Sequence, residues 1–363
     1  MYNNRISTAA RYNLLTKDIQ KNEANYLRLT QQLASGKKVA NITDDPIAAV
    51  NIVHTTRQLG QIETFNQNTQ LAMEELDTLD DLMELATGYL QQAWDKGLEA
   101  NNGTYGRTSL EALKTEIDEI TKTMVDLANT EFNDNFIFAG ANTKLTPFEL
   151  DDNGNIIYRG TTQDNPDYIR QTEVADGVFE VINTTGDKVF GYYEKYYTDS
   201  TGSGTKYYQQ TDNSGNVIYV DKDGNQYSGD VADLTENENY SGVMGALRML
   251  SNSIQETIDA KDAKDPDAET AAYQKMFSTM DMFSKAHNEI VTEQTKFGGV
   301  YNRMQMTEST LETNNENLTS YLSSLQDVDI ASAASKWMQA QYSYQASLQV
   351  AAQTMNMSLL NYI

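Results

Sequence analysis

The stretch that decides the fold is RYNLLTKDIQKNEANYLRLTQQL, residues 11–33. Its mostly apolar side chains recur at alternating intervals of three and four residues, which places them on one seam of a helix. The seam consists of Tyr12, Leu15, Ile19, Asn22, Tyr26, Leu29 and Leu33. A stripe this narrow buries little surface by itself, so we expect the helix to become ordered only against a partner.

The other end of the chain carries a matching stripe in ASKWMQAQYSYQASLQVAAQTM, residues 334–355. This second seam runs through Ile330, Trp337, Gln341, Tyr344, Leu348, Ala351, Met355 and Tyr362. A shift of register between Asp327 and Ile330 predicts a joint before it. A further stripe of the same kind extends for about seven heptads before it, from Met276 to Leu325. Two matching helical ends predict that the chain folds back on itself, so that its first and last helices lie together.

Composition excludes several classes of protein. Cysteine is absent, so disulfides, thiolate metal sites and cysteine nucleophiles are excluded. The first residues lack the continuous apolar segment of a Sec-type signal peptide, and no stretch approaches the roughly 20 apolar residues of a membrane span. A net charge of −25 argues against binding to nucleic acid or to anionic membranes.

The charge lies away from the two ends. Residues 1–45 hold seven Lys/Arg and four Asp/Glu, whereas residues 151–240 hold six Lys/Arg and seventeen Asp/Glu. Near-neutral helical ends suit burial in an assembly, and an acidic middle suits an outward position. An ordinary solvated surface explains the acidic middle equally well.

Helix signals then recur along the chain. Gly36 ends the first helix, and Asp44, Asp45 and Pro46 supply a cap and a first-turn proline for the second. The second helix is predicted to extend toward Asn101. A third follows on heptad positions Leu110, Leu113, Ile117, Ile120, Met124 and Leu127.

The middle of the chain, residues 136–240, reads as β-rich. Turn-forming Asn, Asp and Gly stand between β-prone residues at 152–158, 212–219 and 221–227. Tyrosine pairs occur at Tyr192-Tyr193, Tyr196-Tyr197 and Tyr207-Tyr208, which is consistent with strands that expose amphipathic rings. Helical signals return from Ser241.

We find no pattern that indicates catalysis, metal binding or a cofactor. The two histidines, His54 and His287, lie far apart on helical segments, where a lone histidine is usually a packed residue. The segment 221–225 is better explained as a β-turn than as a calcium loop. The sequence therefore predicts a protein that is not an enzyme, with no catalytic, metal or cofactor residues.

With these residues laid out, the chain resembles the flagellin superfamily, and within it the branch of the hook–filament junction. The resemblance is carried by RIST at 5–8, LASGKKVANITDDPIAA at 33–49, FIFAGANTKLTPF at 136–148, FGGVYNRM at 297–304, and the segment 325–360. It covers residues 1–150 and about 240–363. The Asp44-Asp45-Pro46 entry and the FIFAG segment favour the junction branch over filament flagellin.

The resemblance implies a fold that is mainly α with a β-rich insertion. Residues 1–43 and 326–363 would form a terminal coiled-coil layer, disordered in the monomer, and 44–135 with 265–325 a helical core domain. Residues 136–240 would form an outer β-rich domain, and 241–264 a returning helical connector. By similarity, Leu15, Ile19, Tyr26, Leu29 and Leu33 would pack against Trp337, Tyr344, Leu348 and Met355, with Tyr12 and Ile330 on the same assembly interface.

The resemblance also implies partners and a location. The chain would assemble with copies of itself in a helical layer, between hook-associated protein 1 and flagellin, and an export chaperone would bind its C-terminal segment. It would be extracellular, exported by the flagellar type III system without a cleaved signal peptide. Two alternatives stay open: a filament-forming flagellin, and a glycan- or surface-binding module on the outer domain.

Overall fold

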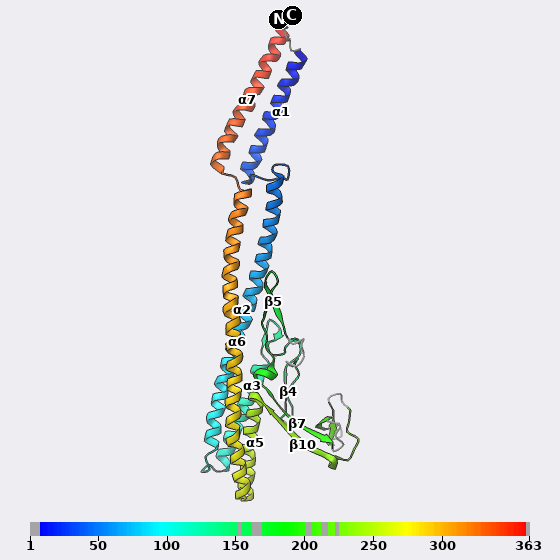
Figure 1. Cartoon of the computed structure of the whole chain (residues 1–363), viewed down its shortest axis with the longest axis vertical. Helices are drawn as coiled ribbons and strands as arrows, with labels where there is room; N and C mark the ends of the chain where they lie inside the picture. The colour runs from blue at the N-terminus through cyan, green and yellow to red at the C-terminus, as the bar shows by residue number, and fades with distance from the viewer. Residues whose placement is uncertain are drawn as a thin grey trace. The chain divides into compact units, whose positions relative to one another are not determined.

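The computed structural model describes residues 8–151, 154–161, 169–199, 205–211, 217–221 and 225–360. It is mainly helical, with a β-rich insertion between the third and fifth helices (Figure 1). This confirms the predicted fold class. The chain forms two compact units, one of residues 1–66 with 309–363 and one of residues 67–308.

The first unit holds the two terminal helices, α1 (Thr8–Ser35) and α7 (Ile330–Leu360). It also includes the beginning of α2 (Pro46–Ala100) and the end of α6 (Pro266–Gln326). Gly36 follows α1 with a φ of +70°, as expected for the residue that ends a helix in the left-handed conformation.

The second unit is built on the rest of α2 and α6, with α3 (Arg107–Ala128) and α5 (Gly242–Ala263). The predicted face of α3 is confirmed, because all its heptad residues except the half-buried Ile120 are buried. Together with α5 and the inner sides of α2 and α6, this face forms one continuous apolar core.

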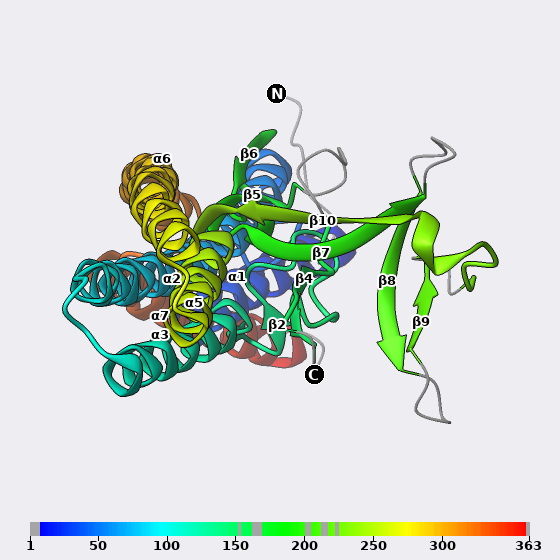
Figure 2. The ribbon, with the colours of Figure 1, turned by 90° about the horizontal axis from the view of Figure 1, so that it is seen from below.

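The insertion contains ten short strands among the described residues. They are β1 (Glu131–Phe132), β2 (Asn135–Phe136), β3 (Phe148–Leu150), β4 (Ile156–Tyr158), β5 (Gln171–Ala175), β6 (Val178–Val181), β7 (Tyr192–Asp199), β8 (Lys206–Thr211), β9 (Val217–Val220) and β10 (Leu234–Ser241). The largest sheet has the order β3-β4-β7-β8-β9, and β10 also pairs with β7 along its whole length. Figure 2 shows β7 and β10 as one long antiparallel ribbon that leads to β8 and β9. A one-turn helix, α4 (Gly186–Val189), and a 3₁₀ turn at Val231–Asp233 lie between the strands.

One of the three predicted turns is described at both of its ends, whereas residues 152 and 153 lie outside the described residues. Leu150 pairs with Ile156, and between them Gly154 has a φ of +76°. Asp151 fixes the turn, because its carboxylate accepts a hydrogen bond of 2.7 Å from the backbone N–H of Asn155. The central residues of the other two turns, 212–216 and 222–224, lie outside the described residues.

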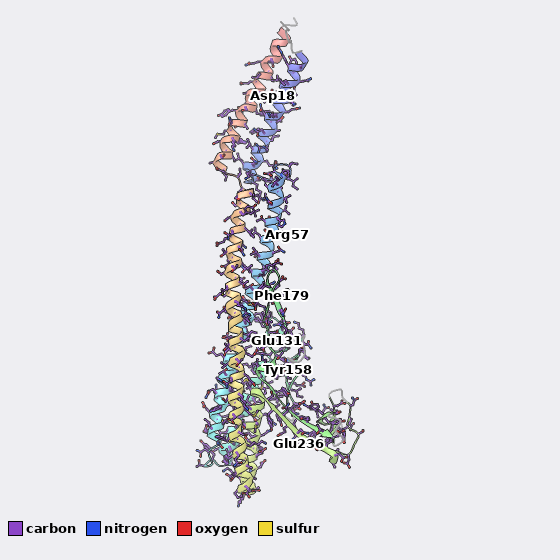
Figure 3. The ribbon with its side chains drawn as sticks, in the orientation of Figure 1. Asp18, Arg57, Glu131, Tyr158, Phe179 and Glu236 are labelled. Carbon is purple, nitrogen blue, oxygen red and sulfur yellow. The ribbon has the colours of Figure 1, made fainter. Side chains whose placement is uncertain are left out.

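A separate hairpin, β5–β6, is tied to the long helices by charged contacts that the sequence did not indicate. Glu180 accepts two hydrogen bonds from Arg303 of α6, at 2.9 and 2.6 Å, and Arg170 pairs with Glu75 of α2. The tip of the hairpin carries Phe179, which is 56% exposed (Figure 3). The insertion is therefore anchored to both α2 and α6.

The tyrosine pairs do not all expose their rings, in contrast to the prediction. Tyr193 is buried, with its ring 4.9 Å from that of Tyr240 and 5.6 Å from the guanidinium carbon of Arg248. Tyr197 is also buried, against the ring of Tyr219. The β7–β10 ribbon curls over α5 and the neighbouring strands, so one side of it became core rather than surface.

We predict that the outer sheet loses stability in alkali through Tyr197. Burial, followed by the hydrogen bond to the Glu236 carboxylate, raises the pKa of Tyr197 to about 12. The folded pKa lies above the unfolded value of about 10, so this contribution is complete below pH 10 and is lost as the pH rises toward 12. Near-ultraviolet circular dichroism during alkaline titration should show the loss, and Tyr197→Phe should reduce it. An unchanged alkaline transition in Tyr197→Phe would contradict this assignment.

Candidate functional site: the paired terminal helices

The two ends of the chain meet in an aromatic stack. Tyr26 of α1 lies between Trp337 and Tyr344 of α7, with ring centroids 5.8 and 6.0 Å away. The Trp337 Nε1–H donates a hydrogen bond of 2.8 Å to the Thr30 hydroxyl, which in turn donates to the Tyr26 carbonyl. These contacts join residues about three hundred positions apart in sequence and fix the facing of the two helices.

The residues of the predicted α1 seam lie on the less exposed side of the helix. Leu29 is 4% exposed, and Tyr12, Leu15, Ile19, Tyr26 and Leu33 are half-buried, whereas most of their neighbours on α1 are exposed. Asp18, next to Ile19, is exposed. The α1 seam therefore faces α7 within the same chain.

Only part of the predicted seam of α7 contacts α1. Trp337 and Tyr344 take part in the stack, but Ile330 is 67% exposed and Leu348 is 44% exposed. The expected packing of Leu348 against α1 within the chain is therefore not found. The Met355 side chain and Tyr362 lie outside the described residues. The role of all these residues in an assembled layer stays a prediction.

The positions that α7 buries instead are small or polar. Ala333 and Ala340 are 4% and 5% exposed, one heptad apart, and Gln32 of α1 is also buried. The Gln32 amide donates a hydrogen bond of 2.8 Å to the Lys38 carbonyl. The heptad spacing of the alanines was the signal that could have located this face.

The two breaks that flank the terminal helices are joined to each other. The Val328 N–H donates a hydrogen bond of 2.9 Å to the Gly36 carbonyl, and the Lys38 N–H donates one of 2.5 Å to the Gln326 carbonyl. Around them Lys37 and Asp327 form an antiparallel bridge. The chain leaves α1 and enters α7 through one short two-stranded joint. The shift of register predicted a joint before α7 but not its pairing with the segment after α1.

The Asp44-Asp45-Pro46 motif lies at the start of α2, and its two aspartates have different structural roles. The Asp45 carboxylate caps α2, accepting hydrogen bonds of 3.1 and 3.0 Å from the N–H groups of Ile47 and Ala48, and Pro46 is the first helical residue. This confirms the predicted cap and proline. Asp44 instead holds the preceding loop, because its carboxylate accepts hydrogen bonds of 3.1 and 2.9 Å from residues 40 and 41.

Beside this motif lies an exposed apolar surface, which we call the α2 entry patch. It consists of Ile42, Ile47, Val50 and Val53, each more than 60% exposed. His54 and Arg57 complete its edge around a shallow hollow of about 360 Å³. Four large aliphatic side chains exposed within twelve residues are unusual for a monomer surface and indicate a contact with another chain. Sequence reasoning missed the patch, because its residues stand beside a cap rather than on a seam.

Comparison with protein families agrees with this architecture at both ends. The model of the bacterial flagellin N-terminal helical region matches residues 6–143, and that of the flagellin C-terminal helical region matches residues 280–363. The two matched ranges together cover more than half of the chain, and the structure pairs their outermost helices, α1 and α7.

Curated relatives narrow the family. Flagellar hook-associated protein 3 of Escherichia coli K12 is 29% identical over 51% of the chain and 56% of that protein. The Salmonella typhimurium protein of the same name is 31% identical over 40% of the chain and 46% of that protein. The chain thus spans about half the length of these relatives. A flagellin of Clostridium tyrobutyricum is 23% identical over 88% of the chain and 91% of that protein.

Solved structures show the same fold. The Legionella pneumophila hook-associated protein 3 superposes with a TM-score of 0.55 at 16% identity, covering 76% of this chain and 98% of that one. The Xanthomonas campestris FlgL gives 0.51 at 18% identity, covering 74% and 99%. The chain belongs to the flagellin superfamily, a class of structural flagellar proteins. Within it, the chain is of the hook-associated protein 3 (FlgL) type.

Two further observations concern the classes excluded by composition. Through the described ranges, no helix combines the length and hydropathy that a membrane crossing requires. The proteins matched above are named for flagellar structures and not for reactions. This agrees with a structural rather than an enzymatic protein.

Proposed function

We propose that the protein is the adaptor between the flagellar hook and the filament, assembling as a short layer between hook-associated protein 1 and flagellin. The observation that carries this is the pairing of α1 with α7 through the Tyr26 stack, beside an exposed α2 entry patch. In such a unit, α7 covers the seam of α1 within the same chain, and the exposed α2 entry patch remains available for contact with another chain. Contacts of this kind, repeated head to tail, build helical layers.

Export belongs to the same proposal. A cysteine-free chain carries no thiol that could be oxidised outside the cell. We propose that it leaves the cell through the flagellar type III system and that an export chaperone binds its C-terminal segment, whose α7 carries the exposed side chains of Met338 and Tyr342. Co-purification with the chaperone should be lost on deletion of 330–363 and retained on deletion of the outer insertion.

Seeded growth tests the junction role. Purified protein would be added to hooks that carry hook-associated protein 1 and, separately, to flagellin seeds, and polymer length would be scored by electron microscopy. Growth that stops after a short layer on hooks supports the adaptor. Long self-propagating filaments would reassign the chain to filament flagellin, the reading that the Clostridium tyrobutyricum match motivates.

The module for glycan or surface binding is less well supported by the structure. Tyr193 and Tyr197, two of the rings that suggested it, are buried in the insertion. A glycan array on the full chain remains its direct test.

We expect the α2 entry patch to be needed for assembly but not for folding. Ile47 is 78% exposed and Val53 68% exposed, so Ile47→Asp combined with Val53→Asp should change the free energy of unfolding by less than about 0.5 kcal/mol. The same change should lower layer formation on hooks by about tenfold or more, since a charge would replace buried apolar contact. Thr56→Asp, an exposed position that is not part of the patch, is the matched control. Equal effects of the patch and control variants would exclude the patch as a contact.

A further inference from the structure

A polar hollow of about 280 Å³ lies between α1 and α7 in the first unit, and we call it the α1–α7 hollow. Its floor is apolar, because Leu29 and Ala340 are 4% and 5% exposed. Its rim consists of three amide side chains, one hydroxyl and two cations: Asn22, Asn25, Gln339, Ser343, Arg28 and Lys336. Pockets for small organic ligands usually begin at about 300 Å³, so this hollow suits a small ion.

The two cations of the hollow form no ion pair with a carboxylate among the residues that the structure describes. Arg28 donates a hydrogen bond of 3.0 Å to the amide oxygen of Asn25, a neutral group that holds the guanidinium without compensating its charge. No residue of α7 is acidic. On α1, Glu23 stands about 140° around the helix from Arg28, and Asp18 lies about 15 Å away along it. The hollow is therefore positively charged.

The two cations also stand near the same level of the helix pair. α1 and α7 run antiparallel (Figure 1), and the hydrogen bond of 2.8 Å from Trp337 to the Thr30 hydroxyl sets their alignment. This alignment brings Arg28 level with Gln339, three residues from Lys336. At a rise of about 1.5 Å per residue, the cations are offset by about 4.5 Å along the pair. Pairing of the helices thus brings two like charges to one hollow, where they repel each other.

We propose that the α1–α7 hollow binds a free oxyanion of the sulfate or phosphate class, which joins the two terminal helices. The guanidinium of Arg28 can donate two parallel hydrogen bonds to such an ion, and the ammonium of Lys336 supplies a second positive charge. The amides of Asn22 and Gln339 add hydrogen-bond donors, one from each helix. Because its donors come from both helices, the ion binds the paired helices more tightly than the separated ones and stabilises their pairing.

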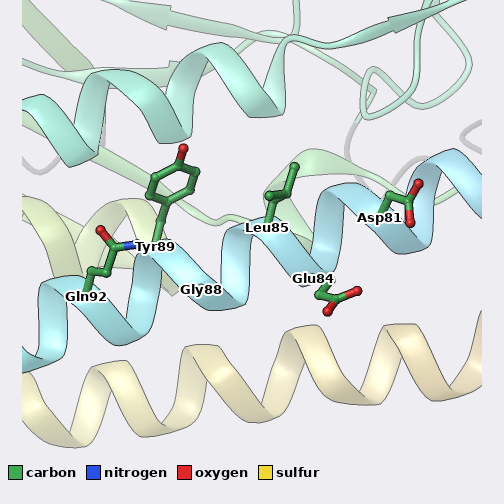
Figure 4. Close-up of a pocket in the computed structure, with 6 residues that line it drawn as sticks. All are labelled: Asp81, Glu84, Leu85, Gly88, Tyr89 and Gln92. Carbon is green, nitrogen blue, oxygen red and sulfur yellow. The ribbon is translucent and has the colours of Figure 1, made fainter.

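Another hollow, on α2 in the second unit, has the opposite charge. Figure 4 shows Asp81 and Glu84 among the residues that line it, beside Leu85 and Gly88. Its volume of about 540 Å³ would admit an ion, but its two carboxylates would repel an oxyanion. We therefore expect the ion to act on the first unit and not on this part of the second.

Tryptophan fluorescence tests the site directly. The chain has two tryptophans, so Trp94→Phe leaves Trp337, which contacts α1 next to the hollow, as the only reporter. Sodium sulfate or sodium phosphate would be added to this full-length variant, with sodium chloride keeping the ionic strength constant. We expect a change in Trp337 emission that saturates at millimolar oxyanion. No change, a change that chloride produces equally, or a linear rise without saturation would overturn the proposal, since exclusion of sulfate from protein surfaces has no saturation point.

Three substitutions separate binding in the hollow from a general effect of salt. Arg28→Gln and Lys336→Gln should each weaken the apparent affinity by about tenfold or more, because each removes a charge-assisted contact. Lys17→Gln is the matched control, since it removes the same charge from an exposed position of α1 outside the hollow. It should change the affinity by less than about twofold, because solvent screens a distant exposed charge. An equal loss of affinity in all three variants would overturn the site.

Hydrogen exchange gives a readout that needs no substitution of tryptophan. Sulfate should slow amide exchange in α1 and α7 of the unmodified chain and leave exchange in α3, within the second unit, unchanged. Equal slowing in both units, or none in either, would contradict the site. The proposal does not depend on the junction role, so a chain that binds the ion yet forms no short layer on hooks would contradict that role alone.

Discussion

Replacing Gly191 with alanine should destabilise the second unit by about 2–5 kcal/mol. Gly191 has a φ of +66°, a conformation that costs an L-residue about 1–2 kcal/mol. The added Cβ would also overlap the carbonyl of Ser241 and the backbone nitrogen of Gly242. Overpacking of this kind adds about 1–3 kcal/mol. Urea unfolding followed by circular dichroism would measure the loss.

Relief by a local shift is blocked by the residue that precedes Gly191. The preceding Phe190 is fully buried, with its ring 4.8 Å from that of Phe138, and its carbonyl accepts a hydrogen bond of 2.8 Å from Met244 at the start of α5. Gly191 and Gly242 thus let the ends of β7 and β10 cross where the insertion joins the helical core. The overlap therefore cannot be relieved without opening that core.

Gly177→Ala is the matched control for this prediction. Gly177 has nearly the same φ, +68°, but a Cβ there meets no atom within 4 Å. It should therefore cost only the backbone term, about 1–2 kcal/mol. If both variants lost the same free energy of unfolding, backbone strain alone would explain the effect at Gly191, and the close crossing of β7 and β10 would not contribute to it.

The sequence predicted the helical part of the fold well because its signals are local. The Asp45 cap, Pro46 and Gly36 each determine a helix end through contacts within a few residues. Heptad spacing likewise identified the buried face of α3, since one turn of helix brings those residues together. Such elements need no knowledge of distant parts of the chain.

The insertion was predicted only as β-rich, because strand pairing depends on residues far apart. β7 pairs with β10 some forty residues away, and β5–β6 forms its own hairpin that Arg303 of α6 holds in place. Which tyrosines become buried follows from those pairings, so Tyr193 could not be distinguished from Tyr192 beforehand. Alternation along a strand defines two faces but not which one is covered.

The α7 seam shows a different limit of pattern reading. After Tyr344, a step of three leads to Ser347 and a step of four to Leu348, and both steps fit a heptad. Hydrophobicity favoured Leu348, but the structure half-buries Ser347 and exposes Leu348. The stack of Tyr26 with Trp337 and Tyr344 sets the rotation of α7, and small residues such as Ala340 then fit beneath α1.

Replacing Leu29 with aspartate should abolish incorporation into flagella while leaving the second unit folded. Leu29 is 4% exposed in the α1–α7 pair, one turn from the Tyr26 stack. Replacing this buried apolar side chain with a carboxylate should cost about 3 kcal/mol or more, because the charge loses contact with water, even though Arg28 and Lys336 line the adjacent hollow. The two helices α1 and α7 would then separate, and the surface that we propose for assembly of the layer would be lost. Electron microscopy of flagella from cells that express the variant would score incorporation.

Gln31→Asp provides the matched control, because it adds the same charge two residues away on the exposed side of α1. It should assemble normally, whereas Leu29→Met, which keeps an apolar side chain, should retain most of the activity in assembly. Thermal unfolding of the second unit should be the same in all three variants, because none of the substituted residues belongs to its core. Normal flagella in Leu29→Asp cells would show that pairing of α1 with α7 is not what assembly requires. Loss of assembly in Gln31→Asp as well would mean that added charge anywhere on α1 is harmful, and the specific role of the seam would have to be given up.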